Sequence, residues 1–163
     1  MSEIRIASYI PGAIGRVAEL HASYYSKAWD FGLYFEAKVA AELSQFLRRF
    51  DSARDGFWTA VVDGRVEGSI AIDAAAADTE GAHLRWFILA EALRGRGVGN
   101  RLMQAAVGLC RQCGYGRVFL WTFAGLDPAR HLYEKFGFRL AEELEGGQWG
   151  KRVLEQRYVL VLG

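Results

Sequence analysis

The segment that decides the fold is residues 83–114, HLRWFILAEALRGRGVGNRLMQAAVGLCRQCG. Its first seven residues are mostly apolar and contain no glycine or proline, which predicts a strand over 83–89. A glycine-rich turn follows at 94–99, and residues 99–113 then carry apolar side chains at helical spacing until Gly114 ends the helix. This order leaves free backbone N–H groups at a helix N-terminus, where an anion such as a phosphate binds.

The rest of the chain is predicted to alternate between helices and strands. A first helix begins after Pro11-Gly12, and its apolar face is Ile14, Val17, Ala18, His21 and Tyr25. A second helix has its apolar face at Val39, Leu43, Phe46, Leu47 and Phe50. Asp127 is expected to cap a short helix that starts with Pro128 and runs to Phe136. Strands are expected at 4–8, 57–62, 66–72, 118–123 and 153–162, with a hairpin turn at Asp63-Gly64 and loops at 26–34 and 73–81.

The composition fits a single α/β domain over residues 1–163, with a mixed sheet. The net charge is +1, so bulk electrostatics favours neither a nucleic acid nor a membrane as a partner. The first 25 residues lack the pattern of a signal peptide, and no apolar run reaches the ~18–20 residues of a membrane span. We therefore expect a cytoplasmic protein.

The only two cysteines, Cys110 and Cys113, have the spacing of a redox pair. They also extend an apolar helical stripe formed by Leu102, Ala106 and Leu109. They lie near the end of the helix, whereas redox pairs usually open one. We interpret both cysteines as core residues, with a redox role as the alternative.

The glycine-rich turn fails two common nucleotide-binding patterns. A Walker loop ends in Gly-Lys-Ser/Thr, but here Gly99 is followed by Asn100 and Arg101. The dinucleotide fingerprint lacks its last glycine and the acidic residue expected ~20 positions later.

What the turn does match is Arg-x-x-Gly-x-Gly, from Arg94 to Gly99, which resembles the pyrophosphate-binding motif of the GNAT superfamily of N-acyltransferases. A second element, LYEKFGF at 132–138, is similar to a signature of the same superfamily. The two motifs stand in the expected order. The chain looks most similar to the acetyltransferase half of MarR–GNAT fusion proteins, through residues 83–86, 148–150 and 155–157. It has no winged-helix segment, so DNA binding is not implied.

The resemblance implies a GNAT-like fold, with a mostly antiparallel sheet, flanking helices and a splayed pair of fourth and fifth strands. It implies acetyl-CoA as co-substrate and no metal. The pantetheine arm would pair with the backbone of the fourth strand, and the N–H near Leu89 would polarise the thioester carbonyl. The residues implied in cofactor binding are Phe87, Ile88, Leu89, Arg94, Gly95, Arg96, Gly97, Val98, Gly99, Asn100 and Asp127.

The catalytic residues implied are Tyr133 as general acid and His83 as base. Tyr133 would protonate or hydrogen-bond the departing thiolate. His83 takes the place of a carboxylate found in many relatives, and we expect it to share a strand face with Arg85, Phe87 and Leu89. Glu80 and Glu155 are alternatives, and a mechanism without a dedicated base is another. Leu126 replaces a common cofactor-binding asparagine.

The acceptor is expected to be the amine of a small molecule. The candidate substrate-binding residues are Tyr25, Trp29, Arg85 and Trp149. The alternative for the aromatic residues is plain core packing. The alternative for the arginines is an ion pair with Asp73 or Glu155. Aromatic walls favour an apolar or cationic amine, whereas Arg85 and Arg157 favour a carboxylate-bearing one. The alternative functions are an acyl-CoA sensor without catalysis and a protein or peptide N-acetyltransferase. A homodimer is compatible with the resemblance.

Overall fold

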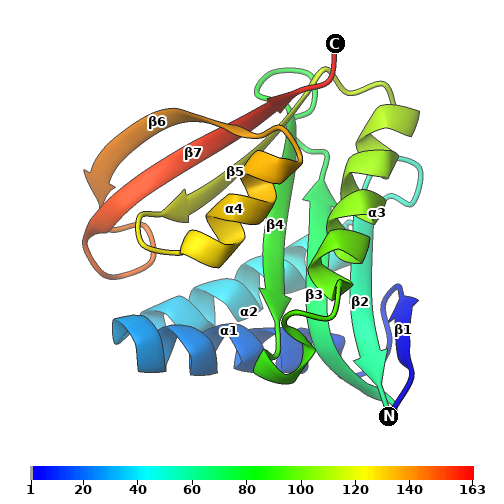
Figure 1. Ribbon diagram of the computed structural model, residues 1–163, viewed down its shortest axis with the longest axis vertical. Helices are drawn as coiled ribbons and strands as arrows, with labels where there is room; N and C mark the ends of the chain where they lie inside the picture. Colours follow the sequence, from blue (N-terminus) through cyan, green and yellow to red (C-terminus); the bar gives the residue numbers. More distant parts are fainter. Residues whose placement is uncertain (1) are drawn as a thin grey trace.

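The computed structural model describes residues 2–163, in which seven strands form one sheet with helices on both faces (Figure 1). The strands are β1 Ile4–Ala7, β2 Gly56–Val62, β3 Arg65–Asp73, β4 Ala82–Leu89, β5 Arg117–Phe123, β6 Arg139–Gly146 and β7 Val153–Val161. The helices are α1 Ala13–Trp29, α2 Leu33–Arg48, α3 Val98–Gln112 and α4 Asp127–Lys135. The strand order is β1-β2-β3-β4-β5-β7-β6, and within residues 2–163 only β4 and β5 pair in parallel. This confirms the predicted mixed, mostly antiparallel sheet.

Each face of the sheet has its own hydrophobic core. Helix α3 buries Leu102, Met103 and Ala106 against one face, as its 3.6-residue apolar spacing predicts. Helices α1 and α2 bury Val17, Leu43 and other apolar residues against the opposite face. The cysteine Cys110 is part of the α3 core, and burial raises the pKa of its thiol to about 12.

Strands β4 and β5 separate soon after they meet. They pair only through Ala82 with Val118 and His83 with Phe119. Beyond this point β5 continues beside β7, and Figure 1 shows β4 and β5 diverging toward α4 and the loop before α3. The rest of β4 therefore has no strand partner on its β5 side, as the resemblance implies for this pair.

Strand β4 carries a bulge at Trp86. This residue has a φ of 49°, and the register between β3 and β4 shifts at this point. Ser69 Oγ donates a hydrogen bond to Trp86 O at 2.7 Å, and the Arg85 guanidinium lies 4.1 Å from the Trp86 ring. These contacts hold a bulky residue in a conformation that it rarely adopts. The bulge turns Phe87 and Leu89 toward the α3 core, whereas Arg85 contacts α2. The prediction that these residues share one face with His83 is therefore wrong.

Helix α1 is longer than the sequence pattern indicated. Residues 26–29, predicted to be loop, continue the helix to Trp29, and Asp30 ends it with a φ of 58°. The extension places Tyr25 and Trp29 one turn apart, with ring centroids 5.8 Å and 4.9 Å from that of Phe123. Aromatic packing against β5 thus stabilises a helical turn that the local composition does not favour.

Two other elements differ from expectation. Asp127 is the first residue of α4 and not its cap, since the cap position is Leu126 and no side chain caps this helix. The Asp127 carboxylate instead lies in the first turn, 3.8 Å from the Arg130 guanidinium, where its negative charge interacts favourably with the helix dipole. Phe50 lies beyond the end of α2. In residues 2–163, no helix is long and apolar enough to cross a membrane.

Candidate active site

The glycine-rich turn lies between β4 and α3, as predicted. Gly95 and Gly97 have φ values of 76° and 78°, a conformation that residues with a side chain rarely adopt. Gly97 is the cap residue of α3, and no side chain in the described part of the chain caps the first N–H groups of the helix. These N–H groups and the helix dipole provide a site for a phosphate anion.

Gly99 has a different requirement, which is close packing. A Cβ atom at this position would lie 3.3 to 3.5 Å from side-chain atoms of Leu132, Leu89 and Phe87. These three side chains come from α4 and β4, so Gly99 keeps α3 close to the place where the two elements meet. A larger residue would enter the space between them.

A groove of about 310 Å³ runs from the glycine-rich turn along the unpaired side of β4 to α4. We call it the loop-side groove, and its lining is mostly apolar with Arg94 at the turn. Its lining residues are Tyr24, Tyr25, Phe87, Ile88, Leu89, Arg94, Gly95, Gly97, Gly99, Asn100, Leu126, Pro128, Ala129 and Leu132. Its volume lies within the range of ~300–1,000 Å³ typical of small-molecule sites.

The structure brings most of the predicted cofactor residues to this groove. Arg94 stacks over the Tyr24 ring at 4.8 Å, and Asn100 Oδ1 accepts a hydrogen bond from Lys135 Nζ at 3.0 Å. Arg96 is exposed outside the lining, and the side chain of Val98 is buried in the α3 core, so Val98 offers only its backbone. Asp127 lies outside the groove, because the start of α4 directs it toward Arg130. Asp127 is therefore not among the residues that line the groove, and its contact with the cofactor stays a prediction.

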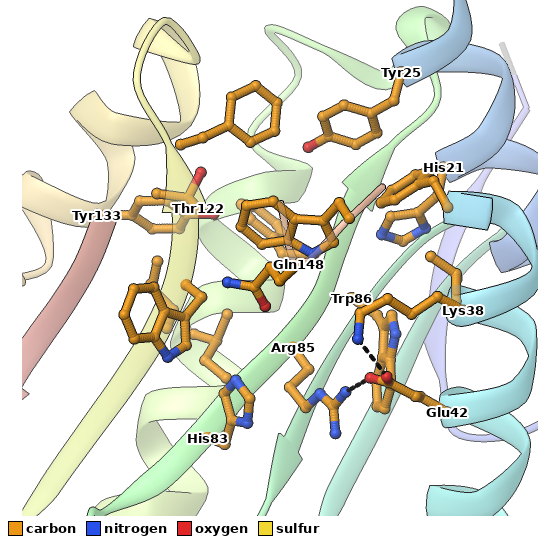
Figure 2. A pocket seen from close by; sticks show the side chains of 18 residues that line it. His21, Tyr25, Lys38, Glu42, His83, Arg85, Trp86, Thr122, Tyr133 and Gln148 are labelled. Carbon is orange, nitrogen blue, oxygen red and sulfur yellow. Dashed lines mark hydrogen bonds and ion pairs between the residues drawn. The ribbon is translucent and has the colours of Figure 1, made fainter. Parts of the chain in front are cut away.

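A second cavity, of about 150 Å³, lies on the α1–α2 side of the gap between β4 and β5 (Figure 2). We call it the aromatic cavity. Its lining residues are His21, Tyr25, Phe35, Lys38, Val39, Glu42, His83, Leu84, Arg85, Trp86, Phe87, Leu120, Trp121, Thr122, Phe123, Tyr133, Gln148 and Trp149. Tyr25 and Phe87 line both this cavity and the loop-side groove, so the two spaces adjoin.

Tyr133 of α4 is directed into the aromatic cavity near this junction (Figure 2). Its side chain is 6% exposed and packs against Phe87, Phe138 and Tyr158, with ring centroids 6.0 to 6.2 Å apart. Burial, with a smaller effect of Tyr25 and Tyr158, raises the pKa of Tyr133 above its ordinary value. The phenol therefore keeps its proton at neutral pH and can act as a hydrogen-bond donor.

His83 lies on another wall of the same cavity. Its ring stacks on Phe119, with centroids 4.4 Å apart and an interplanar angle of 15°. Burial first, and then the nearby Arg85 cation, lowers the pKa of His83 to about 3. The imidazole is thus neutral at physiological pH, and its low pKa makes it a weak proton acceptor.

Charged side chains from α2 and β4 form one end of the cavity. Both Lys38 and Arg85 bind the Glu42 carboxylate, and the Lys38 contact measures 2.7 Å (Figure 2). Arg85 also donates to Asp73 Oδ2 at 3.2 Å, the ion pair considered in the sequence analysis. Arg157 Nε lies 3.4 Å from Glu142 Oε1, and Arg157 is not among the residues that line this cavity. Sequence reasoning did not identify Lys38 and Glu42, whose helical spacing of four residues was the available signal.

The predicted aromatic residues divide into two groups. Tyr25 and Trp149 line the cavity, and Trp149 contacts Phe123 at 5.6 Å between centroids. Trp29 lines neither space, because it packs against Phe123 and covers Gly125, where a Cβ atom would lie 2.5 Å from its ring. Trp29 is therefore a packing residue and not part of the cavity wall.

The turn between β6 and β7 covers one side of the aromatic cavity. Glu155 is buried, and its carboxylate accepts hydrogen bonds from Gln148 N at 3.0 Å and Gln148 Nε2 at 2.8 Å. Lys151 Nζ bonds Asp30 Oδ2 at 2.9 Å, which ties the turn to the end of α1. Glu155 of β7 thus holds Gln148 of this turn in place.

Comparisons with known proteins agree with the fold and the two motifs. The sequence profile of the Acetyltransferase (GNAT) family matches residues 14–138. The chain is 30% identical over 141 residues to a probable N-acetyltransferase, camello, of Xenopus tropicalis, which covers 81% of this chain and 61% of that protein. The chain therefore spans about three fifths of the length of that relative.

Solved structures show the same fold at low identity. An acetyltransferase from Streptococcus agalactiae has a TM-score of 0.79 at 21% identity, covering 98% of each chain. The protein yncA of Salmonella typhimurium, solved with its cofactor acetyl-CoA, has a TM-score of 0.72 at 13% identity and covers 99% of this chain and 95% of that one. On the family match, the two motifs and the sheet topology, this chain belongs to the Acetyltransferase (GNAT) family.

Proposed function

We propose that the chain transfers the acetyl group of acetyl-CoA to a primary amine of a small molecule by direct attack. The observation that carries this proposal is the place of Tyr133, in the aromatic cavity beside its junction with the loop-side groove. A co-substrate in the groove and an amine in the cavity would meet at this phenol. Acetyl-CoA supplies the acetyl group as an activated thioester, and the chain binds and orients the reactants.

The loop-side groove has features that would bind CoA. The free N–H groups at the start of α3, with Arg94 beside them, would bind the pyrophosphate. The unpaired backbone of Phe87, Ile88 and Leu89 would pair with the pantetheine amides in the manner of an added strand. The missing side chain of Gly99 leaves room for that arm beside Leu132.

The Tyr133 hydroxyl would donate a hydrogen bond to the sulfur of the departing CoA. Attack by the amine nitrogen forms the new C–N bond, and the C–S bond then breaks with its electron pair on sulfur. The Tyr133 hydroxyl hydrogen-bonds this thiolate and relays a proton to it, solvent returns a proton to the phenol oxygen, and the N–H near Leu89 stabilises the carbonyl oxygen. The raised pKa of Tyr133 keeps the phenol protonated as a hydrogen-bond donor, and because it also disfavours full proton transfer to a thiolate, the hydrogen bond to sulfur is its main contribution.

His83 has a different role in this proposal from that of a strong base. With its pKa lowered to about 3, it cannot readily take a proton from an ammonium ion. We therefore propose that the amine reacts in its neutral form, with solvent removing its proton, and that His83 offers a neutral hydrogen-bond acceptor to it.

The small volume of the aromatic cavity, about 150 Å³, supports a small acceptor. The Lys151–Asp30 ion pair and the Gln148–Glu155 hydrogen bonds hold the β6–β7 turn over the cavity, which leaves little room for an extended peptide. Residues 83–86 and 148–150 resemble those of MarR-fused acetyltransferases. Four of these residues line the aromatic cavity: His83, Arg85, Gln148 and Trp149. A common acceptor class with those proteins is part of the proposal.

The test is thiol release from acetyl-CoA with a panel of butylamine, 2-phenylethylamine, ethanolamine and phenylalanine, with the acetylated product identified by mass. We expect thiol and N-acetyl product in equal amounts with at least one amine. Calorimetric binding of CoA without thiol release across a widened amine panel would contradict catalysis and favour the sensor function.

A further inference from the structure

His21 is a buried polar residue of the aromatic cavity that the mechanism above does not use. It lies on α1, one turn before Tyr25, and its side chain is 6% exposed. The rings of Tyr25 and Phe35 flank it, each with a centroid 6.4 Å away. Figure 2 shows the imidazole on the wall opposite Tyr133.

One hydrogen bond decides which ring nitrogen of His21 carries the proton. Nδ1 lies 2.8 Å from the Val17 carbonyl oxygen, one turn earlier in α1. A carbonyl oxygen can only accept, so Nδ1 must be the donor. Burial lowers the pKa of His21 to about 4, although the Val17 bond opposes this, so the ring is neutral at pH 7. Nε2 therefore carries a lone pair.

The lone pair at Nε2 has no partner within residues 2–163. The only hydrogen bond of the ring in this part of the chain is that of Nδ1. Across the same residues, no side-chain nitrogen or oxygen is both shielded from solvent and without a partner. Nε2 must therefore reach the open space of the cavity that His21 lines.

Neighbouring charged groups do not satisfy this nitrogen. The Lys38 ammonium, which Figure 2 shows below His21, turns away to bind Glu42 Oε2 at 2.7 Å. Arg85 is bound to Glu42 and Asp73. His21 Nε2 is thus a neutral acceptor atom of the cavity wall, and the bond from Nδ1 to the backbone fixes its direction among aromatic rings.

We propose that His21 Nε2 accepts a hydrogen bond from the acetyl acceptor and selects molecules that present an N–H or O–H group at this wall. This inference rests on the proposed function, because it treats the aromatic cavity as the acceptor site. A carbonyl or carboxylate oxygen placed there would face the lone pair and be rejected. His21 is in this view a specificity-determining residue.

The first test is ¹⁵N NMR of the histidine ring at pH 7 in the full chain. We expect Nδ1 to be protonated and Nε2 to be unprotonated. Addition of butylamine, 2-phenylethylamine, ethanolamine or phenylalanine should move the Nε2 resonance and leave Nδ1 nearly unchanged. An Nε2–H tautomer, or an Nε2 resonance that none of the four amines moves, would overturn the inference.

The second test compares His21→Asn with His21→Gln. The asparagine amide can keep the bond to Val17 but leaves no acceptor at the position of Nε2, whereas the glutamine amide oxygen can replace Nε2. With the amine that is turned over, we expect the KM of the amine to rise about tenfold in His21→Asn and less than about threefold in His21→Gln, as for loss of one hydrogen bond. The KM of acetyl-CoA should stay unchanged in both.

The two tests separate the inference from the function on which it rests. Amines that move Nε2 without any thiol release would contradict the proposed catalysis but not the binding role of His21. Turnover with equal amine KM in the wild type and His21→Asn would overturn the role of His21 and leave the acetyltransferase function standing.

Discussion

The loop-side groove and the aromatic cavity meet at Tyr25 and Phe87, yet they are built from different parts of the chain. The groove owes its shape largely to backbone, because Gly95 and Gly97 supply a left-handed turn and Gly99 supplies close packing. The cavity owes its shape to side chains from α1, α2, β4, β5 and the β6–β7 turn.

This difference separates the two tasks of a transferase. A backbone site binds a constant co-substrate and tolerates few changes, since a side chain added at a glycine blocks it or strains the turn. A side-chain cavity can change its acceptor by single substitutions, because each wall residue comes from a separate element. We therefore expect changes in the groove to alter CoA binding alone, and changes in the cavity to alter amine use alone.

Tyr133 stands between the two regions, and its loss should have the largest effect. In Tyr133→Phe we expect kcat to fall by about 100-fold or more, as for loss of a general acid, with CoA affinity unchanged by calorimetry. Because the pKa of Tyr133 is raised, its proton stays in place to pH 10, so the wild type should show no alkaline loss of rate from this group below that pH. Equal kcat values for the variant and the wild type would remove Tyr133 from the mechanism.

Filling the groove at Gly99 should separate cofactor binding from folding. A Gly99→Leu side chain would occupy the space beside Leu89 and Leu132, so we expect CoA affinity to fall at least about 100-fold in calorimetry. Gly108 of the same helix has no atom within 4 Å of an added Cβ, so Gly108→Ala is the matched control. The control should bind CoA normally and melt at the same or a slightly higher temperature. Normal CoA binding by Gly99→Leu would place the cofactor elsewhere.

The same contrast explains what the sequence could predict. The glycine-rich turn and the Asp63-Gly64 hairpin are local, since each residue type is required by its own backbone conformation. The length of α1 depends on packing of Trp29 against Phe123, nearly a hundred positions away, and was missed. Strand β6 is almost wholly exposed, so its sequence carries no burial pattern, and only pairing with β7 defines it.

The site shows the same contrast between features set by local sequence and features set by packing of distant residues. The loop-side groove was predicted from two motifs, and most of its predicted residues line it. The aromatic cavity was predicted only in part. The bulge at Trp86 reversed the face of Phe87 and Leu89, and no sequence pattern required a positive φ at a tryptophan. His21 looked like one more position on an apolar helix face, because the bond to Val17 that gives it a direction is invisible in the sequence.

The neutral state of His21 should make the cavity side of the molecule sensitive to acid. Its folded pKa of about 4 lies below the ordinary value of 6.5, so its contribution to stability is complete above pH 6.5 and is lost as the pH falls toward 4. Between pH 7 and pH 5 we expect the wild type to lose about 2 kcal/mol more unfolding free energy than His21→Asn, at ~1.4 kcal/mol per pKa unit. Urea titrations at both pH values measure this difference.

His131 provides the control for that experiment, because it is exposed on α4. His131→Asn should show the acid dependence of the wild type. If His21→Asn also loses as much stability as the wild type, then His21 is not held in its neutral form by the fold.

The smallest effect is expected at the charged edge of the groove. Arg94 is exposed and stacks on Tyr24, so solvent weakens its contribution to phosphate binding. In Arg94→Gln we expect CoA affinity to fall about fivefold at low salt and less at high salt, with the KM of the amine unchanged. A change in amine KM without a change in CoA affinity would show that Arg94 serves the aromatic cavity and not the groove.

The central claim is that CoA occupies the loop-side groove and presents its sulfur to Tyr133 at the edge of the aromatic cavity. A crystal structure with acetyl-CoA tests it most directly. We predict the pyrophosphate at about 3 Å from the N–H groups that begin α3, the pantetheine arm along Phe87–Leu89, and the sulfur within hydrogen-bonding reach of the Tyr133 hydroxyl. A pyrophosphate bound away from the glycine-rich turn, or a sulfur on the side of β4 away from Tyr133, would contradict the claim.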